Sequence, residues 1–366
     1  MPDRKRIGVI FGGQSTEHDI SRISAQYIIK NLNREKFDVI MFGITKDGKW
    51  LLYDGPAEKL ESEEWQEIAE SQLKEKELKQ IADSDLNVEN SMDILNSDID
   101  VVFPVLHGCM GEDGTIQGYF EIAGIPYVGS GVLGSALCMD KAYSKIVFEK
   151  EGLPQGKYVV FSRKQINENT EFLAEKVEKI LEYPCFVKPS NAGSSVGVTK
   201  AHDRKELIAA LKYASKFDIR VLAEEFINGR EIECAILGND EPVASIVGEI
   251  LPSNEFYDFE AKYINEKSAT VIPADLSKDT IQKIRDYAVR AYKAADCAGL
   301  SRVDFFVHKK TGEIYLNEIN TMPGFTSISM YPKLWEASGI PCEELLERLI
   351  KLALERHEDN KRALNI

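Results

Sequence analysis

Apolar and polar residues follow one another in a pattern that predicts alternating strands and helices in the first third of the chain. Residues 5–13 form a short apolar run that ends in two glycines, and residues 20–32 carry apolar side chains at helical spacing. Apolar runs at 38–45 and 100–107 predict two further strands. Strands that alternate with helices are typical of an α/β domain with a parallel sheet.

The rest of the pattern predicts a small α+β unit, followed by antiparallel strands and two long helices. Residues 58–83 are rich in Glu, Lys and Gln, and we interpret them as a solvated amphipathic helix without a catalytic role. Further helices are expected over residues 115–123, 133–151, 171–182, 277–297 and 342–357. Further strands are expected over residues 125–128, 158–162, 185–189, 196–200, 221–226, 231–237 and 243–250.

Polar residues occupy alternating positions on two strand-like segments near residue 310. Arg302 and Asp304 lie on the first segment, and Glu318 and Asn320 lie on the second. A three-residue loop over 310–312, with its glycine in the left-handed conformation, would join the segments into a hairpin. This register pairs Asp304 with Glu318 and Arg302 with Asn320.

The same register pairs Lys309 with Glu313 and places the four polar groups on one face, because strand side chains alternate. Two facing carboxylates repel each other, and a hard cation between them would relieve the repulsion. Oxygen ligands of this kind suit Mg²⁺. We therefore interpret the hairpin as a magnesium site; the alternative is a solvated hairpin face with one ordinary salt bridge.

Composition and length indicate a globular protein of two or three domains. The chain has 366 residues, of which 43% are hydrophobic and 29% are charged. No apolar run approaches the roughly 20 residues that span a bilayer, and Met1–Arg6 is not followed by a signal-peptide core. We expect a cytoplasmic protein without a membrane segment.

Charge and cysteine spacing exclude several other classes. A net charge of −15 opposes nonspecific binding to nucleic acid, so any anionic ligand needs a local cluster of cations or backbone amides. The six cysteines contain no Cys-x-x-Cys pair, which favours buried free thiols over a zinc site or a disulfide framework.

Two glycine-rich segments bear on nucleotide binding. Gly129-Ser-Gly131-Val-Leu-Gly134 matches the dinucleotide fingerprint, but it follows the third or a later strand, and no acidic residue ends a following strand. We interpret it as a turn and helix cap. No Walker-type loop occurs, so ATP would need lysines on strands and a flexible loop, as in the segment from Lys188 to Ser195.

A set of motifs in a fixed order spans nearly the full chain and resembles the D-alanine–D-alanine ligases, a family of ATP-grasp enzymes. The matching segments are Phe11-Gly-Gly-Gln-Ser-Thr-Glu17-His-Asp-Ile-Ser21, His107-Gly, Gly111-Glu-Asp-Gly-Thr115, Met139-Asp-Lys141, Lys188-Pro-Ser, Gly193-Ser-Ser-Val-Gly197, Tyr257-Asp-Phe-Glu-Ala-Lys-Tyr263, Arg302-Val-Asp304 and Asn317-Glu-Ile-Asn320-Thr-Met-Pro-Gly324.

This resemblance implies a three-domain ATP-grasp fold of α/β and α+β type, with an N-terminal Rossmann-like domain that has a parallel sheet. The implied domains are 1–129 for substrate binding, 130–222 as a small ATP-grasp unit and 223–366 as the catalytic unit. The implied reaction joins two D-alanine molecules through an acylphosphate, with release of ADP and phosphate, for peptidoglycan synthesis. The family also implies a homodimer.

The resemblance further implies roles for individual residues. ATP would contact residues of the central and C-terminal domains, namely Lys141, Lys188, Ser195, Glu224, Glu225, Ile227, Glu231 and Lys262. Two Mg²⁺ or Mn²⁺ ions would be held by Asp304, Glu318 and Asn320. Glu17, Ser194 and Tyr263 would position the first D-alanine, with His107 near its carboxylate. Arg302 and the Gly324 N–H would stabilise the oxyanion, and Ser329 and Met330 would receive the second substrate.

Three of these residues also have an ordinary structural interpretation, and the function of the whole chain has alternatives. His107 is typical of a core histidine at a strand end, Tyr263 of a packing residue and Ser194 of a turn residue. A ligase that joins D-alanine to D-lactate or D-serine is a second enzymatic interpretation; Tyr263 argues against D-lactate. A nonenzymatic nucleotide-binding protein is a third interpretation, and an NAD oxidoreductase is a fourth.

Overall fold

The computed structural model describes residues 4–82, 98–251 and 269–361, and the chain divides into two compact units. Unit 1 comprises Met1–Val132 together with Met322–Ile366, and unit 2 comprises Leu133–Thr321. The C-terminal segment therefore returns to the unit that contains the N-terminus. Within the described ranges, no helix combines the length and the apolar character that crossing a membrane requires. The three-domain division stays a prediction.

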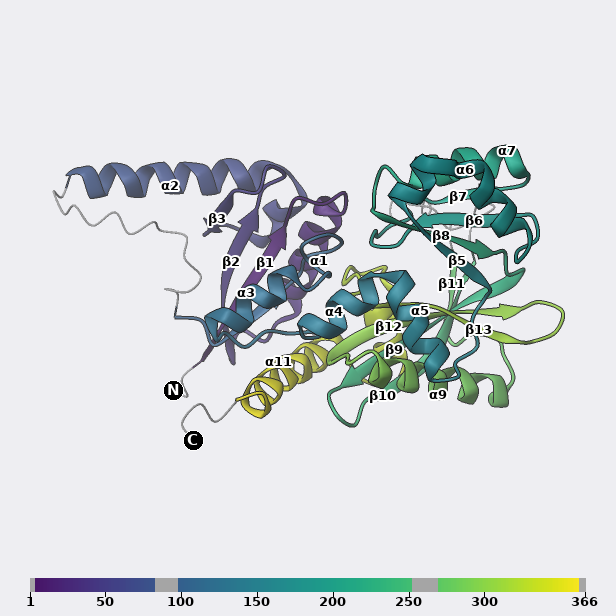
Figure 1. The fold of residues 1–366 in the computed structure, drawn as a ribbon. Coiled ribbons are helices and arrows are strands. Elements are labelled where there is room, and N and C mark those ends of the chain that lie inside the picture. The colour runs from purple at the N-terminus through teal and green to yellow at the C-terminus, as the bar shows by residue number, and fades with distance from the viewer. Residues whose placement is uncertain (1–3, 83–97, 252–268, 362–366) are drawn as a thin grey trace, which may run out of the picture. The chain divides into compact units, whose positions relative to one another are not determined.

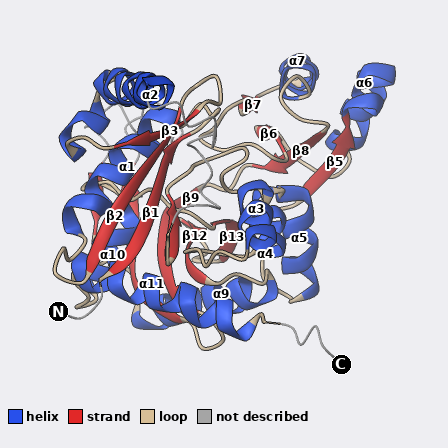
Figure 2. Cartoon of the chain, turned by 90° about the vertical axis from the view of Figure 1, so that its left-hand side faces the viewer, coloured by secondary structure: helices blue, strands red, loops and turns tan. Residues whose placement is uncertain are grey.

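Unit 1 is built on a four-stranded sheet with the order β3-β2-β1-β4. Figure 2 shows β1 and β2 side by side in this sheet. Its strands are β1 (Lys5–Gly12), β2 (Phe37–Ile44), β3 (Trp50–Tyr53) and β4 (Val101–Pro104). β1 pairs in parallel with β2 and β4, which confirms the predicted parallel sheet. The antiparallel edge strand β3 was not predicted. The expected strand over 125–128 supplies a single bridge, from Tyr127 to Val102.

The helices of unit 1 cover this sheet. They are α1 (His18–Asn31), the 3-10 helix η1 (Ala57–Glu61), α2 (Glu64–Ala82), α3 (Thr115–Ala123), α10 (Met330–Ala337) and α11 (Cys342–Asp359). The predicted helix over 58–83 is thus two elements, and Trp65 at the start of α2 is fully buried against Phe11. A Cβ at Gly43 would lie 2.0 Å from the Trp65 ring, so this strand position requires glycine. α10 was not predicted.

Unit 2 contains a four-stranded antiparallel sheet with the order β5-β8-β6-β7. Its elements are β5 (Tyr158–Ser162), α6 (Arg163–Glu178), β6 (Cys185–Pro189), β7 (Thr199–Ala201), α7 (Arg204–Ala214) and β8 (Arg220–Glu225). The two helices lie on the same face of the sheet (Figure 1), where their apolar residues share a buried core with the strands. This arrangement confirms the predicted small α+β unit, although α7 was missed.

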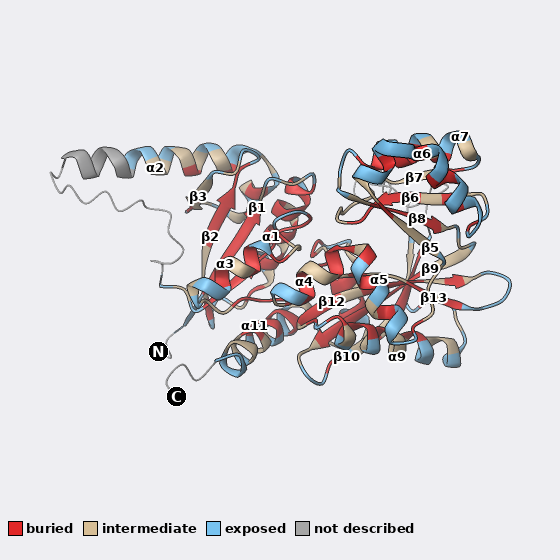
Figure 3. Ribbon diagram, viewed as in Figure 1, coloured by how far each residue is buried: buried red, intermediate tan, exposed pale blue. Residues whose placement is uncertain are grey.

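The second sheet of unit 2 has five antiparallel strands with the order β11-β10-β9-β12-β13. The strands are β9 (Gly229–Gly238), β10 (Val243–Leu251), β11 (Ala269–Val271), β12 (Gly299–His308) and β13 (Ile314–Asn320), and the helix α9 (Lys278–Ala294) precedes β12. One face packs on α9 through Ile232, Cys234, Val303 and Phe305. Buried residues run along these strands (Figure 3).

The predicted helix over 133–151 is broken into α4 (Val132–Met139) and α5 (Lys141–Lys150). The break lies at Asp140, which has extended backbone angles and caps α5 by accepting a hydrogen bond from the Ala142 N–H. Asp is a favoured N-cap residue because its side chain satisfies an amide that lacks a helical partner. Lys141 consequently stands in the first turn of α5.

The predicted pairs Asp304–Glu318 and Arg302–Asn320 are confirmed, but through a different hairpin from the one expected. The His308 N–H donates to the Glu313 carbonyl, so the Lys309–Glu313 pair is wrong by one residue and the loop is longer. Pairing then shifts between Asp304 and Phe305, because Asn317 forms a β-bulge on β13. The longer loop shifts the register of the two strands by one residue, and the bulge shifts it back.

The bulge also decides which side chains of β13 face the core. Ile314 and Leu316 precede it and Ile319 follows it, and all three point into the buried cluster beneath the sheet. Strict alternation from Leu316 would send Glu318 into that cluster. The extra residue reverses the phase, and Glu318 therefore lies on the opposite face.

Candidate active site

The polar residues of the β12–β13 hairpin form one connected group. Arg302 donates two hydrogen bonds to Asp304, from Nε to Oδ1 at 2.8 Å and from the terminal nitrogen to Oδ2 at 2.7 Å. The Asn320 amide donates to the same Oδ2 at 2.9 Å. Glu318 lies 3.5 Å from Nζ of Lys141. The four residues therefore share one face, as predicted, and cations from the protein already lie beside both carboxylates.

This face suits a divalent cation by donor type and charge. Glu233 on β9 faces Asp304 across the strand pair, so three carboxylates and two cations, Arg302 and Lys141, meet here. Among these five residues, the carboxylates outnumber the cations by three to two. Over the described part of the chain, no group of three or more His, Cys, Asp or Glu side chains is arranged to hold a metal. A cation at Asp304 and Glu318 would therefore need further oxygen ligands, which nucleotide phosphates can supply.

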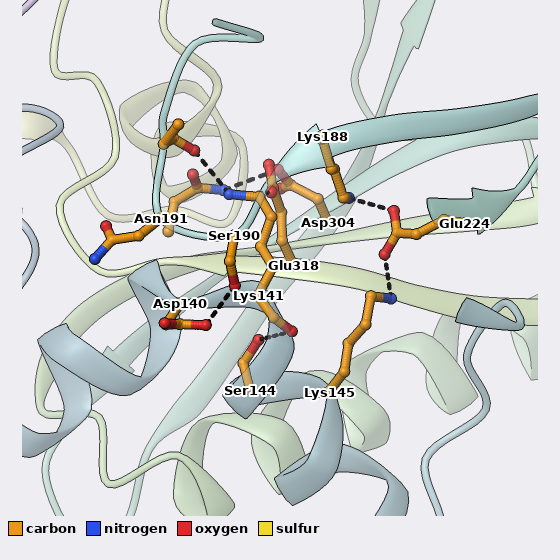
Figure 4. A network of polar contacts seen from close by, with 12 residues as sticks. Asp140, Lys141, Ser144, Lys145, Lys188, Ser190, Asn191, Glu224, Asp304 and Glu318 are labelled. Atoms are coloured by element: carbon orange, nitrogen blue, oxygen red, sulfur yellow. Dashed lines mark hydrogen bonds and ion pairs between the residues drawn. The ribbon is translucent and has the colours of Figure 1, made fainter. Parts of the chain in front are cut away.

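A second cluster lies beside this face and joins three secondary elements (Figure 4). Glu224 on β8 lies 2.5 Å from Nζ of Lys188 on β6 and 2.9 Å from Nζ of Lys145 on α5. Burial raises the pKa of Glu224, but the charges of Lys145 and Lys188 outweigh it and lower this pKa to about 2. Burial lowers the pKa of Lys145, which Glu224 opposes. Two lysines thus share one carboxylate, an arrangement that suits an anionic ligand.

The glycine- and serine-rich loop after β6 is tied to the start of α5. The Lys141 N–H donates to the Ser190 carbonyl at 3.0 Å, and Nζ of Lys141 donates to the Ala192 carbonyl at 2.9 Å. Asp140 accepts hydrogen bonds from the Ser190 hydroxyl and from the Arg220 guanidinium. These contacts place Lys141 beside the loop.

Ser194 and Ser195 in this loop both have positive φ angles, of 48° and 59°. This conformation costs a non-glycine residue about 1 kcal/mol or more. The loop therefore holds two consecutive residues in a conformation that L-amino acids disfavour. Such strain is typical of segments that serve a ligand.

Unit 1 places Glu17 at the start of α1, where its side chain is buried beside Gly108. A Cβ at Gly108 would lie 2.8 Å from the Glu17 carboxylate, and this residue has a φ of +75°. Glycine is therefore required here for two reasons, the close approach and the backbone angle. The segment His107-Gly108 thus forms one wall around Glu17.

His107 is fully buried and links α1 to the segment that follows β13. Its Nδ1 lies 3.0 Å from the Met322 carbonyl oxygen, and its Nε2 lies 3.3 Å from Oγ of Ser24. The Phe325 N–H donates to the same Ser24 oxygen at 3.2 Å. Burial lowers the pKa of His107. A neutral ring that donates from Nδ1 and accepts at Nε2 satisfies all three contacts.

These contacts hold the segment that contains Gly324 on both sides. The Met322 N–H also donates to Glu112 at 3.2 Å, and the Thr326 N–H donates to Oγ of Ser329 at 3.0 Å. Ser329 is the residue before α10, which begins at the buried Met330. Unit 1 therefore brings together Glu17, His107 and the segment from Met322 to Ser329.

Comparison with known proteins identifies the family. Residues 6–130 match the family described as D-ala D-ala ligase N-terminus, and residues 147–351 match D-ala D-ala ligase C-terminus. A D-alanine–D-alanine ligase of Ruminiclostridium cellulolyticum is 63% identical over 98% of both chains. The chain belongs to the D-alanine–D-alanine ligase family. It is therefore an enzyme of the ligase class.

Two solved structures of this ligase family resemble the chain over almost its full length. The D-alanine–D-alanine ligase of Coxiella burnetii has a TM-score of 0.80 and 35% identity, and covers 97% of this chain and 95% of its own. The VanG D-Ala:D-Ser ligase of Enterococcus faecalis has a TM-score of 0.81 and 40% identity, and covers 96% of this chain and 100% of its own. These neighbours confirm the predicted ATP-grasp fold class.

The structure brings some residues implied by the ligase family together, and the contacts given above do not include the others. Glu225 accepts a hydrogen bond at 2.7 Å from the N–H of Lys157, the residue before β5. Ile227 and Glu231 lie between β8 and β9 and at the start of β9. Lys262 and Tyr263 lie outside the described residues. The roles of Glu225, Ile227, Glu231, Lys262 and Tyr263 stay predictions.

Sequence reasoning missed several residues of these clusters. Lys145 follows Lys141 by one helical turn, a spacing that places both on one side of α5 once the helix start is known. Glu233 lies two residues after Glu231 on β9. Its contact with Arg302 became evident only from the register of the sheet. Ser24 carried no recognisable signal, because a serine within a helix is ordinary.

The glycines of the apparent dinucleotide fingerprint have packing roles in this ligase fold. A Cβ at Gly134 would lie 2.4 Å from the Asp296 carbonyl oxygen, and one at Gly131 would lie 3.1 Å from the Arg356 guanidinium. Gly129 has a φ of +106°. Close packing and a turn therefore account for the motif, in agreement with its interpretation as a turn and helix cap and not as an NAD-binding fingerprint.

Proposed function

We propose that the chain joins two D-alanine molecules to D-alanyl-D-alanine, with ATP converted to ADP and phosphate, and that the product serves peptidoglycan synthesis. Membership of the D-alanine–D-alanine ligase family carries this proposal. The lysine clusters around Glu224 and Glu318 support it, because they provide the local positive charge that a chain of net charge −15 needs to hold ATP.

The chemistry requires activation of the first substrate. A carboxylate is a poor electrophile, and transfer of the γ-phosphoryl group of ATP to one of its oxygens gives an acylphosphate with phosphate as leaving group. The amine of the second D-alanine then attacks the carbonyl carbon, and the C–O bond to phosphate breaks. Lys141 and Lys188 would hold phosphate oxygens during the transfer, and the loop over 193–197 would close over them.

Unit 2 also supplies the groups for metal and for the tetrahedral intermediate. Asp304, Glu318 and Asn320 would hold two Mg²⁺ or Mn²⁺ ions, which neutralise phosphate charge when bound. Arg302 would donate to the oxyanion of the intermediate. Its bidentate contact with Asp304 fixes the plane of the guanidinium before the substrate arrives.

Unit 1 supplies the groups for D-alanine. Glu17 would receive the ammonium of the first D-alanine, and the Gly324 N–H would donate to the oxyanion. His107 holds the segment around Gly324 through the Met322 carbonyl, and it would lie near the carboxylate of the first D-alanine. Ser329 and Met330 would bind the carboxylate of the second substrate. Two residues of unit 2, Ser194 and Tyr263, would help to position the first one.

Phosphate release with D-alanine, L-alanine, D-serine and D-lactate in parallel tests the proposal, with each product identified by mass. We expect release with D-alanine and a product of the mass of D-alanyl-D-alanine. No release above the rate of ATP hydrolysis without an amino acid would contradict it.

A second candidate is a D-alanine–D-serine ligase. The 40% identity to a D-Ala:D-Ser ligase over nearly the full chain favours it over a D-lactate ligase or an NAD oxidoreductase. An equal mixture of D-alanine and D-serine discriminates the two candidates, because the proposed function predicts mainly D-alanyl-D-alanine. A predominance of D-alanyl-D-serine would replace the proposed second substrate.

We further propose that the enzyme acts in the cytoplasm as a homodimer. Its six cysteines are free, as expected in a reducing compartment, and the reaction consumes ATP. Light scattering after gel filtration would test the dimer, since a mass near 41 kDa would indicate a monomer.

A further inference from the structure

We infer that Glu233 is a positioning residue for Arg302 and acts in the ligation reaction through this guanidinium. The inference rests on the proposed function, because Arg302 has a catalytic role only in that reaction. Glu233 lies on β9, outside the hairpin that carries the other acids of the site. It belongs to the interior of unit 2, with an exposed fraction of 3%.

The register of the sheet brings Glu233 to Arg302. β12 lies between β9 and β13, and Asp304 faces Glu233 on one side and Glu318 on the other. Three carboxylates therefore form one row across three strands. The neighbours of Glu233 in sequence, Ile232 and Cys234, point into the core under the sheet, so Glu233 must lie on the polar face.

Arg302 lies against two buried carboxylates at once. Its Nε is 2.8 Å from Oδ1 of Asp304 and 3.1 Å from Oε2 of Glu233. A buried carboxylate is tolerated when an opposite charge is close, and one guanidinium here serves two of them. The guanidinium is therefore held from β9 as well as from its own strand.

The two carboxylates differ in what else they would bind. Asp304 is a proposed metal ligand, and a carboxylate that shares its charge with a divalent cation attracts a guanidinium less strongly. The proposed metal ligands are Asp304, Glu318 and Asn320, and Glu233 has no assigned contact with a metal. Glu233 would therefore still attract Arg302 when Asp304 binds a cation.

Glu233 and Asp304 consequently have different roles. Glu233 fixes the direction of the guanidinium, and Asp304 serves metal and arginine together. Loss of the Glu233 charge should let the guanidinium follow Asp304 alone. Displacement of a catalytic group by about 1 Å can cost roughly 100-fold in rate, and we expect about 10-fold here because one anchor remains.

A double-mutant cycle tests the inference. Glu233→Gln, Arg302→Lys and the double variant are compared with the unchanged protein by kcat, by KM for ATP and by urea unfolding without ligands. We expect Glu233→Gln to lower kcat about 10-fold with KM for ATP within about twofold, and Glu233→Asp to recover part of the loss. In the Arg302→Lys background, Glu233→Gln should cost less than about twofold, because residues that act through one another are not additive.

The control is Glu241→Gln, a substitution at an exposed position in the turn between β9 and β10, which should leave kcat unchanged. Full kcat in Glu233→Gln would overturn the inference, as would equal losses in both backgrounds. If Glu233→Gln does not fold, the cycle is run with Glu233→Asp, and an equal loss of kcat in both backgrounds would mean a structural role only. Failure of the proposed function would appear differently, as absence of D-alanine-dependent phosphate release in the unchanged protein.

Discussion

The substitution Glu224→Gln removes the carboxylate that two buried lysines share. The replacement keeps the shape of the side chain and removes its charge, so that Lys145 and Lys188 face each other without the acid between them. We expect a large loss of stability, because removal of one partner leaves buried charge uncompensated. The affinity for ATP should also fall, since Lys188 loses the contact that orients it.

The magnitude follows from the pKa of Glu224, which is lowered from 4.5 to about 2. A lowering of this size corresponds to about 3 kcal/mol of stability at neutral pH. The unfolded chain takes up this proton near pH 4.5 and the folded chain only near pH 2. The unfolded state therefore binds more protons between these values, and the contribution is present above pH 4.5 and lost as the pH falls toward 2.

Urea unfolding at pH 7 and at pH 3 measures this contribution. Glu224→Gln should be less stable than the unchanged protein by about 3 kcal/mol at pH 7, and the difference should shrink at pH 3. Glu168→Gln, which alters an exposed pair with Lys164 on α6, is the matched control and should change little. Equal stability of Glu224→Gln and the unchanged protein at pH 7 would refute the reasoning, as would a difference that does not depend on pH.

Three further predictions concern the site. Arg302→Ala should lower kcat by about 100-fold or more while ATP binding, measured by calorimetry, stays within about twofold; near-normal dipeptide synthesis would contradict the oxyanion role. Glu17→Gln should raise KM for the first D-alanine without changing KM for ATP, and an unchanged KM for D-alanine in steady-state kinetics would exclude the ammonium contact. Ser24→Ala leaves the buried Phe325 N–H without its acceptor, which costs about 1–3 kcal/mol; a thermal scan should show lower stability, and kcat should fall because the segment around Gly324 shifts.

The sequence predicted the strands and helices best where apolar spacing alone decides them. The limits of α3, β5 and β6 agree with the predicted ranges 115–123, 158–162 and 185–189. Elements such as β3 and α7 were missed because short or mixed segments carry weak periodicity. The break at Asp140 was missed because capping competes with helix continuation through one side chain, which periodicity does not register.

The hairpin shows how a correct pairing of site residues can be predicted from a wrong loop length. The loop was expected to be one residue shorter, and the bulge at Asn317 was not expected. Each error alone would have moved Glu318 away from Asp304. They cancel, because the bulge restores both the pairing and the face that the longer loop would have changed.

Contacts between distant segments were beyond sequence reasoning. Glu233 meets Arg302 only because β9 and β12 are neighbours, and Ser24 meets Phe325 only because the chain returns to unit 1 after residue 321. Sequence motifs mark residues that are close along the chain. They do not mark residues that fold topology brings together.

The fate of the oxygen atoms of the first substrate tests the proposed chemistry most directly. D-alanine labelled with ¹⁸O in its carboxylate is incubated with the enzyme and ATP, and phosphate, nucleotide and dipeptide are analysed by mass. Attack of a carboxylate oxygen on the γ-phosphorus predicts one ¹⁸O in each phosphate released, with unlabelled ADP and one ¹⁸O in the new amide carbonyl. Unlabelled phosphate, or ¹⁸O found in AMP, would contradict the acylphosphate route.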